Sequence, residues 1–377
     1  MAALELQLSI LRKLKYLERR IHTQKEHIRQ LHSQIKGKRT APLSKEAASR
    51  LKARIRQREH AKREYQFLAD LVKTFGDAVA FTYLDKWDIK PLGFRPSPGH
   101  LSGKVGLQFE LRVLRSLLRQ GQAAILNDLT HCLRYGDITI ASPAGPWPIE
   151  LKSGKGEGSR GRAQASRIQH MRDYFNTDHT NSLYGIEGEF VRFGAESREV
   201  NYLKEISALL KRALAAGDAT MTPESGLVYA VHVTDKGRDV QGFMELISRR
   251  TKHFIGKPLL LLLNEDKLGS PAYLPRPLAI RDEAAFWRYL CGEILICVSM
   301  DIGYVEALLK KSGLKCRWIL SRDHMFEIWP EDAAPERGRL IVSAPFFLRV
   351  AYEFLSLEWF LRTITIPQSR MRELLGE

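Results

Sequence analysis

Apolar residues near the start of the chain recur every seven positions, which predicts a long amphipathic helix. The apolar positions of this seam are Leu14, Ile21, Ile28 and Ile35, with Ile10, Leu17 and Leu31 four residues before three of them. Gln24 interrupts the seam between Leu17 and Leu31. A stripe of this kind is stable only when it is buried against another helix or a second copy of the same helix.

A second helix is expected after a break at 36–42, which contains glycine, proline and three basic residues. Ser44 can cap a helix over about 45–75, because its hydroxyl can accept from a free amide of the first turn. We therefore expect an antiparallel helical hairpin, with dimerisation through the first helix as the alternative. Residues 1–76 hold 19 Lys or Arg and 7 Asp or Glu, so +12 of the net charge of +16 lies in this arm.

The pattern changes between about 106 and 175. Residues 106–121 predict an amphipathic helix that stops at glycine, with Phe109, Val113 and Leu117 on one face, broadened by Leu114 and Leu118, and Glu110 beside it. Residues 137–152 predict two short strands joined by a turn rich in proline and glycine. Residues 162–175 predict a further, polar helix. The order is therefore helix, strand, strand, helix.

Acidic side chains and a lysine coincide with the two predicted strands. Asp137 opens the first strand, and Glu150, Leu151 and Lys152 close the second. Since side chains alternate along a strand, Glu150 and Lys152 are expected on one face and Leu151 in the core. Converging acids favour a divalent cation, and a lysine beside them can orient a water molecule. This combination is typical of metal-assisted phosphodiester hydrolysis.

The ordered set of these elements resembles the PD-(D/E)xK, or restriction-endonuclease-like, nuclease superfamily. The Gly-x-x-Phe-Glu start of the helix is most similar to the Mrr-type nucleases. The resemblance implies that Asp137, Glu150 and the Leu151 carbonyl bind Mg²⁺, or Mn²⁺, and that Lys152 positions the attacking water. It implies that Glu110 ligates a second metal or fixes a metal-bound water. The sequence departs from the family motif in one respect, because Gly136 stands where proline usually precedes the aspartate.

The resemblance also implies residues that support the site and bind the substrate. Gln164 or Gln169 on the polar helix would support the site, and contacts with phosphates are expected from Lys155, Arg160, Arg162 and Arg167. Each of these residues also has an interpretation without a functional role. Glu150 and Lys152 could lie at a solvated strand edge, and Glu110, Gln164 and Gln169 could be ordinary helix surface residues. Residues 152–162 could form a flexible solvated loop.

The expected fold class is α/β, a restriction-endonuclease-like mixed sheet flanked by helices and preceded by a basic N-terminal helical hairpin or coiled coil. We expect an arm over 1–90, a nuclease core over 91–185, and an extension or recognition lobe over 186–377. The expected function is a Mg²⁺-dependent DNA endonuclease, with restriction or anti-phage defence as its role by resemblance. The alternatives are a nuclease of RNA or branched DNA in repair or recombination, and a non-enzymatic DNA-binding or scaffold protein. A homodimer or a partner protein held by the N-terminal helices is also possible.

The second half of the chain carries weaker signals. Strands are expected near 226–233, 258–264 and 294–298, helices near 200–216, 239–253, 286–290 and 305–312, and a hairpin over 316–329. The apolar strands at 226–233 and 258–264 should both be buried. Cys132, Cys291, Cys297 and Cys316 lack zinc-type spacing and predict reduced core residues. No apolar run reaches the length of a membrane span, so we expect a cytoplasmic protein without membrane contact.

Overall fold

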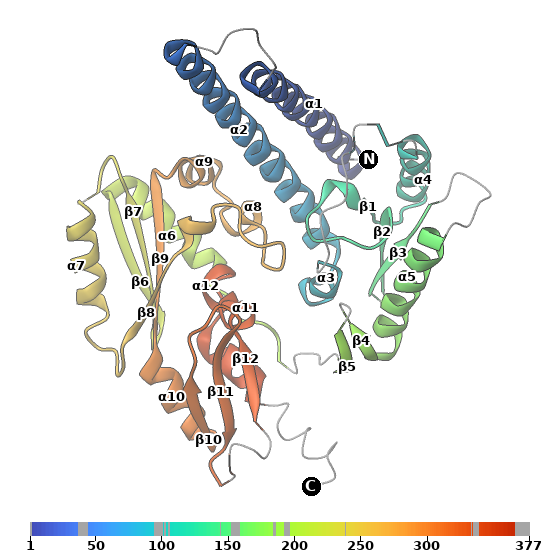
Figure 1. Ribbon diagram of the computed structural model, residues 1–377. Coiled ribbons are helices and arrows are strands. Elements are labelled where there is room, and N and C mark those ends of the chain that lie inside the picture. The colour runs from blue at the N-terminus through green and yellow to red at the C-terminus, as the bar shows by residue number, and fades with distance from the viewer. Residues whose placement is uncertain are drawn as a thin grey trace. The chain divides into compact units, whose positions relative to one another are not determined.

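The structure is a computed structural model that describes residues 2–36, 44–93, 101, 103–104, 106–143, 145–151, 159–183, 186–191, 197–237, 239–332, 334 and 339–365. Of residues 159–165 and Ile186, only the backbone is described. The chain divides into two compact units, Met1–Arg192 and Phe193–Glu377. Both units combine helices with small sheets (Figure 1).

Helices α1 (Ala2–Lys36) and α2 (Lys45–Tyr83) form the predicted hairpin (Figure 1). They run antiparallel, because Arg20 contacts Tyr65 and Arg58 donates to Gln24. The seam positions buried in α1 are Ile10, Leu14, Leu17, Ile21, Gln24 and Leu31, while Ile28 and Ile35 are half-buried near its end. Ser44 caps α2 as predicted, accepting from the Ala47 amide at 3.1 Å. The helix continues eight residues beyond the predicted end, since the residues that follow pack into the core.

The base of the hairpin belongs to the same hydrophobic core as the segment that follows it. Leu4, Leu11 and Leu14 of α1 lie in one buried cluster with Leu114 and Ile138. The Gln7 side chain extends this contact, donating to the Ala124 carbonyl and accepting from the Leu126 amide, both at 2.9 Å. The stretches expected as arm and core are therefore joined in one compact unit.

The remainder of unit 1 is built on a three-stranded antiparallel sheet in the order β1-β2-β3. Its elements are α3 (Lys86–Leu92), α4 (Leu107–Arg119), β1 (Ala124–Leu126), η1 (Asn127–Leu129), β2 (Ile138–Ser142), β3 (Gly145–Ile149), α5 (Ser159–Thr177), β4 (His179–Leu183) and β5 (Ile186–Val191). The predicted strand pair is confirmed as the β2–β3 hairpin, with Ile138 opposite Ile149. The predicted helices over 106–121 and 162–175 are confirmed as α4 and α5.

Two details of unit 1 differ from the sequence prediction. Strand β3 ends at Ile149, so Glu150 and Leu151 follow the strand instead of continuing it. The buried face of α4 consists of Leu107, Glu110, Leu111 and Leu114. The predicted face, through Phe109, Val113 and Leu117, is only half-buried. The apolar residues of α4 cover more than one face of the helix, and the face that is buried is the one that contains Glu110.

Unit 2 contains a four-stranded sheet in the order β6-β7-β9-β8 and a three-stranded sheet in the order β10-β11-β12. The strands are β6 (Asp218–Glu224), β7 (Leu227–Val233), β8 (Pro258–Leu262), β9 (Ile294–Asp301), β10 (Leu314–Trp318), β11 (His324–Pro330) and β12 (Leu340–Ser343). The helical elements are α6 (Leu203–Ala216), α7 (Val240–Arg250), η2 (Leu263–Asp266), α8 (Arg276–Ala279), α9 (Glu283–Cys291), α10 (Ile302–Lys311), α11 (Ala344–Phe347) and α12 (Arg349–Tyr352), and residues 357–365 are also helical. The helices and strands expected in this half are present.

Three expectations are corrected by the structure. In place of one mixed sheet, the described strands form separate sheets in which neighbouring strands are antiparallel. Strand β8 is an edge strand that leaves Leu260 and Leu262 exposed, because β9 takes the central position and pairs with β7 on its other side. Cys291 is exposed, since it falls beside the buried face of α9. No helix of the described residues is long and apolar enough to cross a membrane.

Candidate functional site

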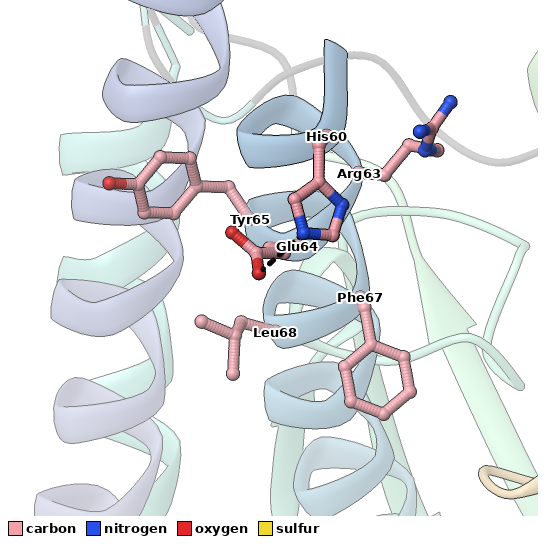
Figure 2. A pocket seen from close by; sticks show the side chains of 6 residues that line it. All are labelled: His60, Arg63, Glu64, Tyr65, Phe67 and Leu68. Carbon is pink, nitrogen blue, oxygen red and sulfur yellow. Dashed lines mark ion pairs between the residues drawn. The ribbon is translucent and has the colours of Figure 1, made fainter. Parts of the chain in front are cut away.

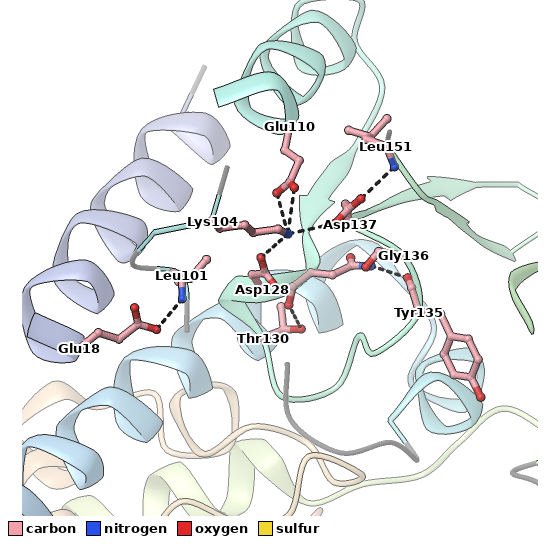
Figure 3. Close-up of polar contacts among 11 residues, drawn as sticks. Glu18, Leu101, Lys104, Glu110, Asp128, Thr130, Tyr135, Gly136, Asp137 and Leu151 are labelled. Atoms are coloured by element: carbon pink, nitrogen blue, oxygen red, sulfur yellow. Dashed lines mark hydrogen bonds and ion pairs between the residues drawn. The ribbon is translucent and has the colours of Figure 1, made fainter. Parts of the chain in front are cut away.

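Three carboxylates of unit 1 converge on one lysine ammonium group (Figure 3). The Lys104 Nζ lies 2.9 Å from Glu110 Oε1, 2.7 Å from Asp128 Oδ2 and 3.0 Å from Asp137 Oδ1. All three distances are typical of charge-assisted hydrogen bonds. The acids come from α4, from η1 and from the residue before β2, so three separate elements contribute to one cluster.

Glu110 reaches the cluster from the buried face of α4, where the residue is only 2% exposed. Gly106 precedes it by one turn, and a Cβ added at Gly106 would lie 3.2 Å from Glu110 Oε1. The absence of a side chain at position 106 therefore leaves room for the Glu110 carboxylate. Burial raises the pKa of Glu110 above its ordinary value; the Lys104 hydrogen bond opposes this effect and the charge of Asp137 adds to it.

Asp128 is positioned by its neighbour Asn127, which is buried. The Asn127 amide nitrogen donates to the carbonyls of Tyr135 and Gly136, at 2.6 and 3.1 Å, and its amide oxygen accepts from the Thr139 hydroxyl at 2.8 Å. In addition, the backbone amide of Asn127 donates to the Asp137 carbonyl at 2.9 Å. Asn127 therefore fixes the separation between the backbones that carry Asp128 and Asp137.

Asp137 is held against the end of β3 by a glycine conformation. Gly136 has φ +72°, and a Cβ there would overlap the Ile149 carbonyl. Proline, with φ locked near −65°, cannot adopt this conformation. The glycine at position 136 thus has a local cause, because its backbone must approach Ile149 closely and with positive φ.

The end of β3 lies beside Asp137. The Asp137 amide donates to the Ile149 carbonyl at 2.8 Å, and Asp137 Oδ2 accepts from the Leu151 amide at 2.8 Å (Figure 3). Leu151 is half-buried against the core, as predicted. Glu150 is half-buried and lies between two residues whose backbones bind Asp137. The structure therefore brings Glu110, Asp137 and the 150–151 backbone into one site.

The electrostatics of the cluster are dominated by the excess of acid. Burial alone would lower the pKa of Lys104, but the hydrogen bonds and charges of Asp128, Glu110 and Asp137 outweigh burial and raise it. The side chain of Lys104 remains 28% exposed, so solvent reaches the group that neutralises the acids. Three carboxyl groups share one ammonium group, which makes this site suited to a cation of higher charge.

The structure describes only some of the site residues predicted on and before α5. Lys152 and Lys155 lie outside the described residues, and of Arg160, Arg162 and Gln164 only the helical backbone is described. Arg167 is exposed, as a phosphate contact requires. Gln169 is exposed and donates to Asp173 at 2.8 Å, so the structure does not bring it into the Lys104 cluster.

The carboxylates do not, as they stand, form a metal site. Among the described residues, no group of three or more His, Cys, Asp and Glu side chains has the arrangement to hold a metal ion. Their oxygens surround an ammonium nitrogen at 2.7–3.0 Å, whereas Mg²⁺ requires oxygens at about 2.0–2.1 Å. The donor set is all oxygen and carries excess negative charge, which fits Mg²⁺ chemically. To bind it, the carboxylates must close in and Lys104 must withdraw.

Two residues of the cluster, Lys104 and Asp128, were not predicted from the sequence. Lys104 lies in the short Ser-Gly-Lys-Val-Gly segment before α4, which has no helical or strand periodicity. Asp128 follows the short apolar run of β1, which sequence analysis did not identify as a strand. An acid at the end of a buried strand is a signal that would have indicated Asp128.

Comparisons of the chain with models of known families, with curated proteins and with solved structures find no match. The geometry of the Lys104 cluster and the sequence pattern around it are therefore the grounds on which a function is assigned.

Proposed function

We propose that this protein is a Mg²⁺-dependent nuclease that hydrolyses phosphodiester bonds of DNA, with its active site at the Lys104 cluster and a restriction-endonuclease-like core. The observation that supports this most is the convergence of Glu110, Asp128 and Asp137 beside the end of β3, where Glu150 and Leu151 follow. The motif predicted Glu110, Asp137 and Glu150 together from positions up to 40 residues apart.

Each residue has a separate part in the proposal. Asp137, Glu150 and the Leu151 carbonyl would hold the ion, with Glu110 or Asp128 supplying a further oxygen. Bound there, Mg²⁺ would supply charge stabilisation at the scissile phosphate and a water of lowered pKa. The Leu151 amide keeps one oxygen of Asp137 oriented toward β3. Lys152 would orient the attacking water and stabilise the developing negative charge.

Lys104 is assigned the role of a resident cation. Without its ammonium, three carboxylates within a few ångströms of one another would repel, and burial would favour their protonation. Lys104 keeps them ionised and in place. When the carboxylates bind a divalent ion, Lys104 must move outward, and its partial exposure permits that movement. Released, it is a free cation at the mouth of a site for a polyanionic substrate.

The test is cleavage of supercoiled plasmid, single-stranded DNA and RNA with Mg²⁺, Mn²⁺ or EDTA. We expect metal-dependent cutting by the wild type and a loss of at least about a hundredfold in Asp137→Asn, because a principal metal ligand is removed. Lys152→Ala and Asp128→Asn should also lose activity. The RNA arm separates the DNA nuclease from the RNA alternative.

The matched control is Asp173→Asn, which makes the same chemical change on the exposed surface of α5. It should cut like the wild type. Equal residual cutting by the wild type, Asp137→Asn and Lys152→Ala would refute the proposed site. Absence of cutting under every condition, with all proteins folded, would favour the non-enzymatic DNA-binding alternative.

A further inference from the structure

One face of α2 carries basic residues along about four helical turns. Lys52, Arg56, His60 and Arg63 follow one another at intervals of three or four residues, and Phe67 continues the row. Because positions three and four apart share a face of a helix, these five side chains form one stripe. All five are exposed. The contacts with α1 are made from another face of the helix, through residues such as Ile55, Arg58 and Tyr65.

The end of this stripe is hollowed. A shallow cavity of about 550 Å³ is lined by His60, Arg63, Glu64, Tyr65, Phe67 and Leu68 (Figure 2). In Figure 2, Arg63 and Phe67 project from one side of α2 while Tyr65 projects from the other. Tyr65 is held by Arg20, whose Nη2 donates to the tyrosine hydroxyl at 3.0 Å.

The aromatic ring at the end of the stripe distinguishes it from a solvated charged face. Phe67 is 39% exposed, although a phenylalanine exposed on a helix loses the benefit of burial. It stands one turn from Arg63, and the exposed Leu68 also lines the hollow. Glu64 is the acid in the hollow, and it pairs with His60 at 3.3 Å. The flat apolar ring of Phe67 and the exposed guanidinium of Arg63 together match a nucleotide, which has a base to stack and a phosphate to bind.

We propose that the stripe is a docking surface for single-stranded nucleic acid, with phosphates on Lys52, Arg56 and Arg63 and one unpaired base stacked on Phe67. The inference rests on the proposed function in assuming a nucleic-acid substrate, but it assigns the binding to the helical arm. It adds a stacking interaction, which phosphate-binding residues alone do not provide.

The experiment measures affinity by fluorescence anisotropy of a labelled oligothymidine and of a blunt duplex, in EDTA so that nothing is cut. Arg56→Glu/Arg63→Glu should weaken binding at least tenfold and flatten the dependence of log K on log salt by roughly 1.4, about 0.7 for each phosphate that is no longer neutralised. Phe67→Ala should weaken single-strand binding roughly fivefold or more and leave the duplex unchanged. The control is Arg12→Glu/Arg19→Glu, the same charge change at exposed positions of α1.

Circular dichroism establishes that every variant is folded. Unchanged affinity in Arg56→Glu/Arg63→Glu, or an equal weakening in the α1 control, would overturn the assignment to α2. A Phe67→Ala variant that binds single strands like the wild type would overturn the stacking interaction. Cleavage by Asp137→Asn is measured separately, so the two proposals fail independently. If Arg56→Glu/Arg63→Glu binds nucleic acid like the wild type while the wild type cuts DNA, only the docking surface is rejected. If the same variant binds more weakly but the wild type never cuts, only the nuclease is rejected.

Discussion

Two charged clusters of this protein, one in each unit, have opposite composition. In unit 1, Lys104 is shared by three carboxylates and remains partly exposed. In unit 2, Arg349 forms an ion pair with Glu353, Arg276 is buried on the neighbouring helix α8, and all three residues are at most 2% exposed. Solvent reaches the lysine of the first cluster, whereas the second cluster is enclosed by protein.

The proposed function requires the unit 1 cluster to exchange its cation, whereas burial holds the ion pair of the unit 2 cluster in place. Both unit 2 arginines bind backbone, since Arg276 donates to the Tyr352 carbonyl at 3.0 Å and Arg349 to the Ala272 carbonyl at 2.9 Å. Glu353 binds Arg349 at 2.8 Å and also accepts from the Leu274 amide at 3.1 Å. These interactions join α8, α12 and the loop before α8 into one structure. We therefore interpret the unit 2 cluster as structural and the Lys104 cluster as functional.

The largest expected effect is the removal of the acid from the unit 2 cluster. Glu353→Ala leaves the buried Arg349 guanidinium without its carboxylate, and we expect the free energy of unfolding to fall by about 3–5 kcal/mol. Urea denaturation followed by circular dichroism measures this. Arg29→Ala, which removes an exposed ion pair in α1, is the control and should cost less than about 0.5 kcal/mol. A Glu353→Ala variant as stable as the control would show that this cluster is not structural.

Sequence periodicity predicted the longer helices and several of the strands, but not the way they meet. The heptad of α1, the Ser44 cap and the β2–β3 turn each depend on local chemistry, and each is confirmed. The burial of Glu110 is not local, because the apolar residues of α4 permit more than one inward face. The five successive leucines at 259–263, of which β8 contains four, likewise carry no information about which side of the strand is covered or which strand of the sheet is central.

The candidate site was partly predictable for the same reason. Asp137, Glu150 and Glu110 lie at spacings that a known motif recognises, so sequence alone indicated them. Lys104 and Asp128 enter the cluster through a segment without periodicity and through a turn ordered by Asn127, and these interactions exist only after folding. Only the residue type and the polar helix favoured Gln169, and the side chain is exposed on α5.

A second effect tests the backbone that places Asp137. In Gly136→Ala the alanine must adopt a positive φ, and its Cβ overlaps the Ile149 carbonyl. In Gly121→Ala the alanine must adopt a similar φ of +78°, but no atom lies within 4 Å of its Cβ. Both variants pay about 1–2 kcal/mol for the left-handed conformation. Only Gly136→Ala must also move Asp137 or β3. We expect it to lose roughly 2–4 kcal/mol of stability in urea denaturation and to lose cleavage, while Gly121→Ala keeps cleavage. Equal effects of the two would show that the close approach to Ile149 does not position the site.

The smallest expected effect concerns the cation of the unit 1 cluster. Lys104→Met removes the ammonium from three carboxylates and should destabilise the metal-free protein by about 1–2 kcal/mol, because the remaining acids repel and are partly buried. The pKa of Lys104 is raised in the folded protein. The stabilisation that Lys104 provides is therefore fully present below its unfolded-state pKa of about 10.4, and it is lost as the pH rises through its folded-state pKa. The stability gap between wild type and Lys104→Met should therefore be constant from about pH 7 to 10 and close above it.

The same variant distinguishes a structural lysine from a resident cation. If Lys104 occupies the position of a divalent ion, Lys104→Met should bind Mn²⁺ at least about tenfold more tightly than the wild type, since no ammonium has to be displaced from the carboxylates. Titration followed by electron paramagnetic resonance measures free Mn²⁺ without any need for cleavage. The Lys104→Met/Asp137→Asn double variant should lose the added affinity, because a carboxylate of the cluster is neutralised. Weaker Mn²⁺ binding by Lys104→Met than by the wild type would instead mean that Lys104 helps to assemble the metal site. Lys104 would then not compete with a divalent ion for the three carboxylates, and its role as a resident cation would be rejected.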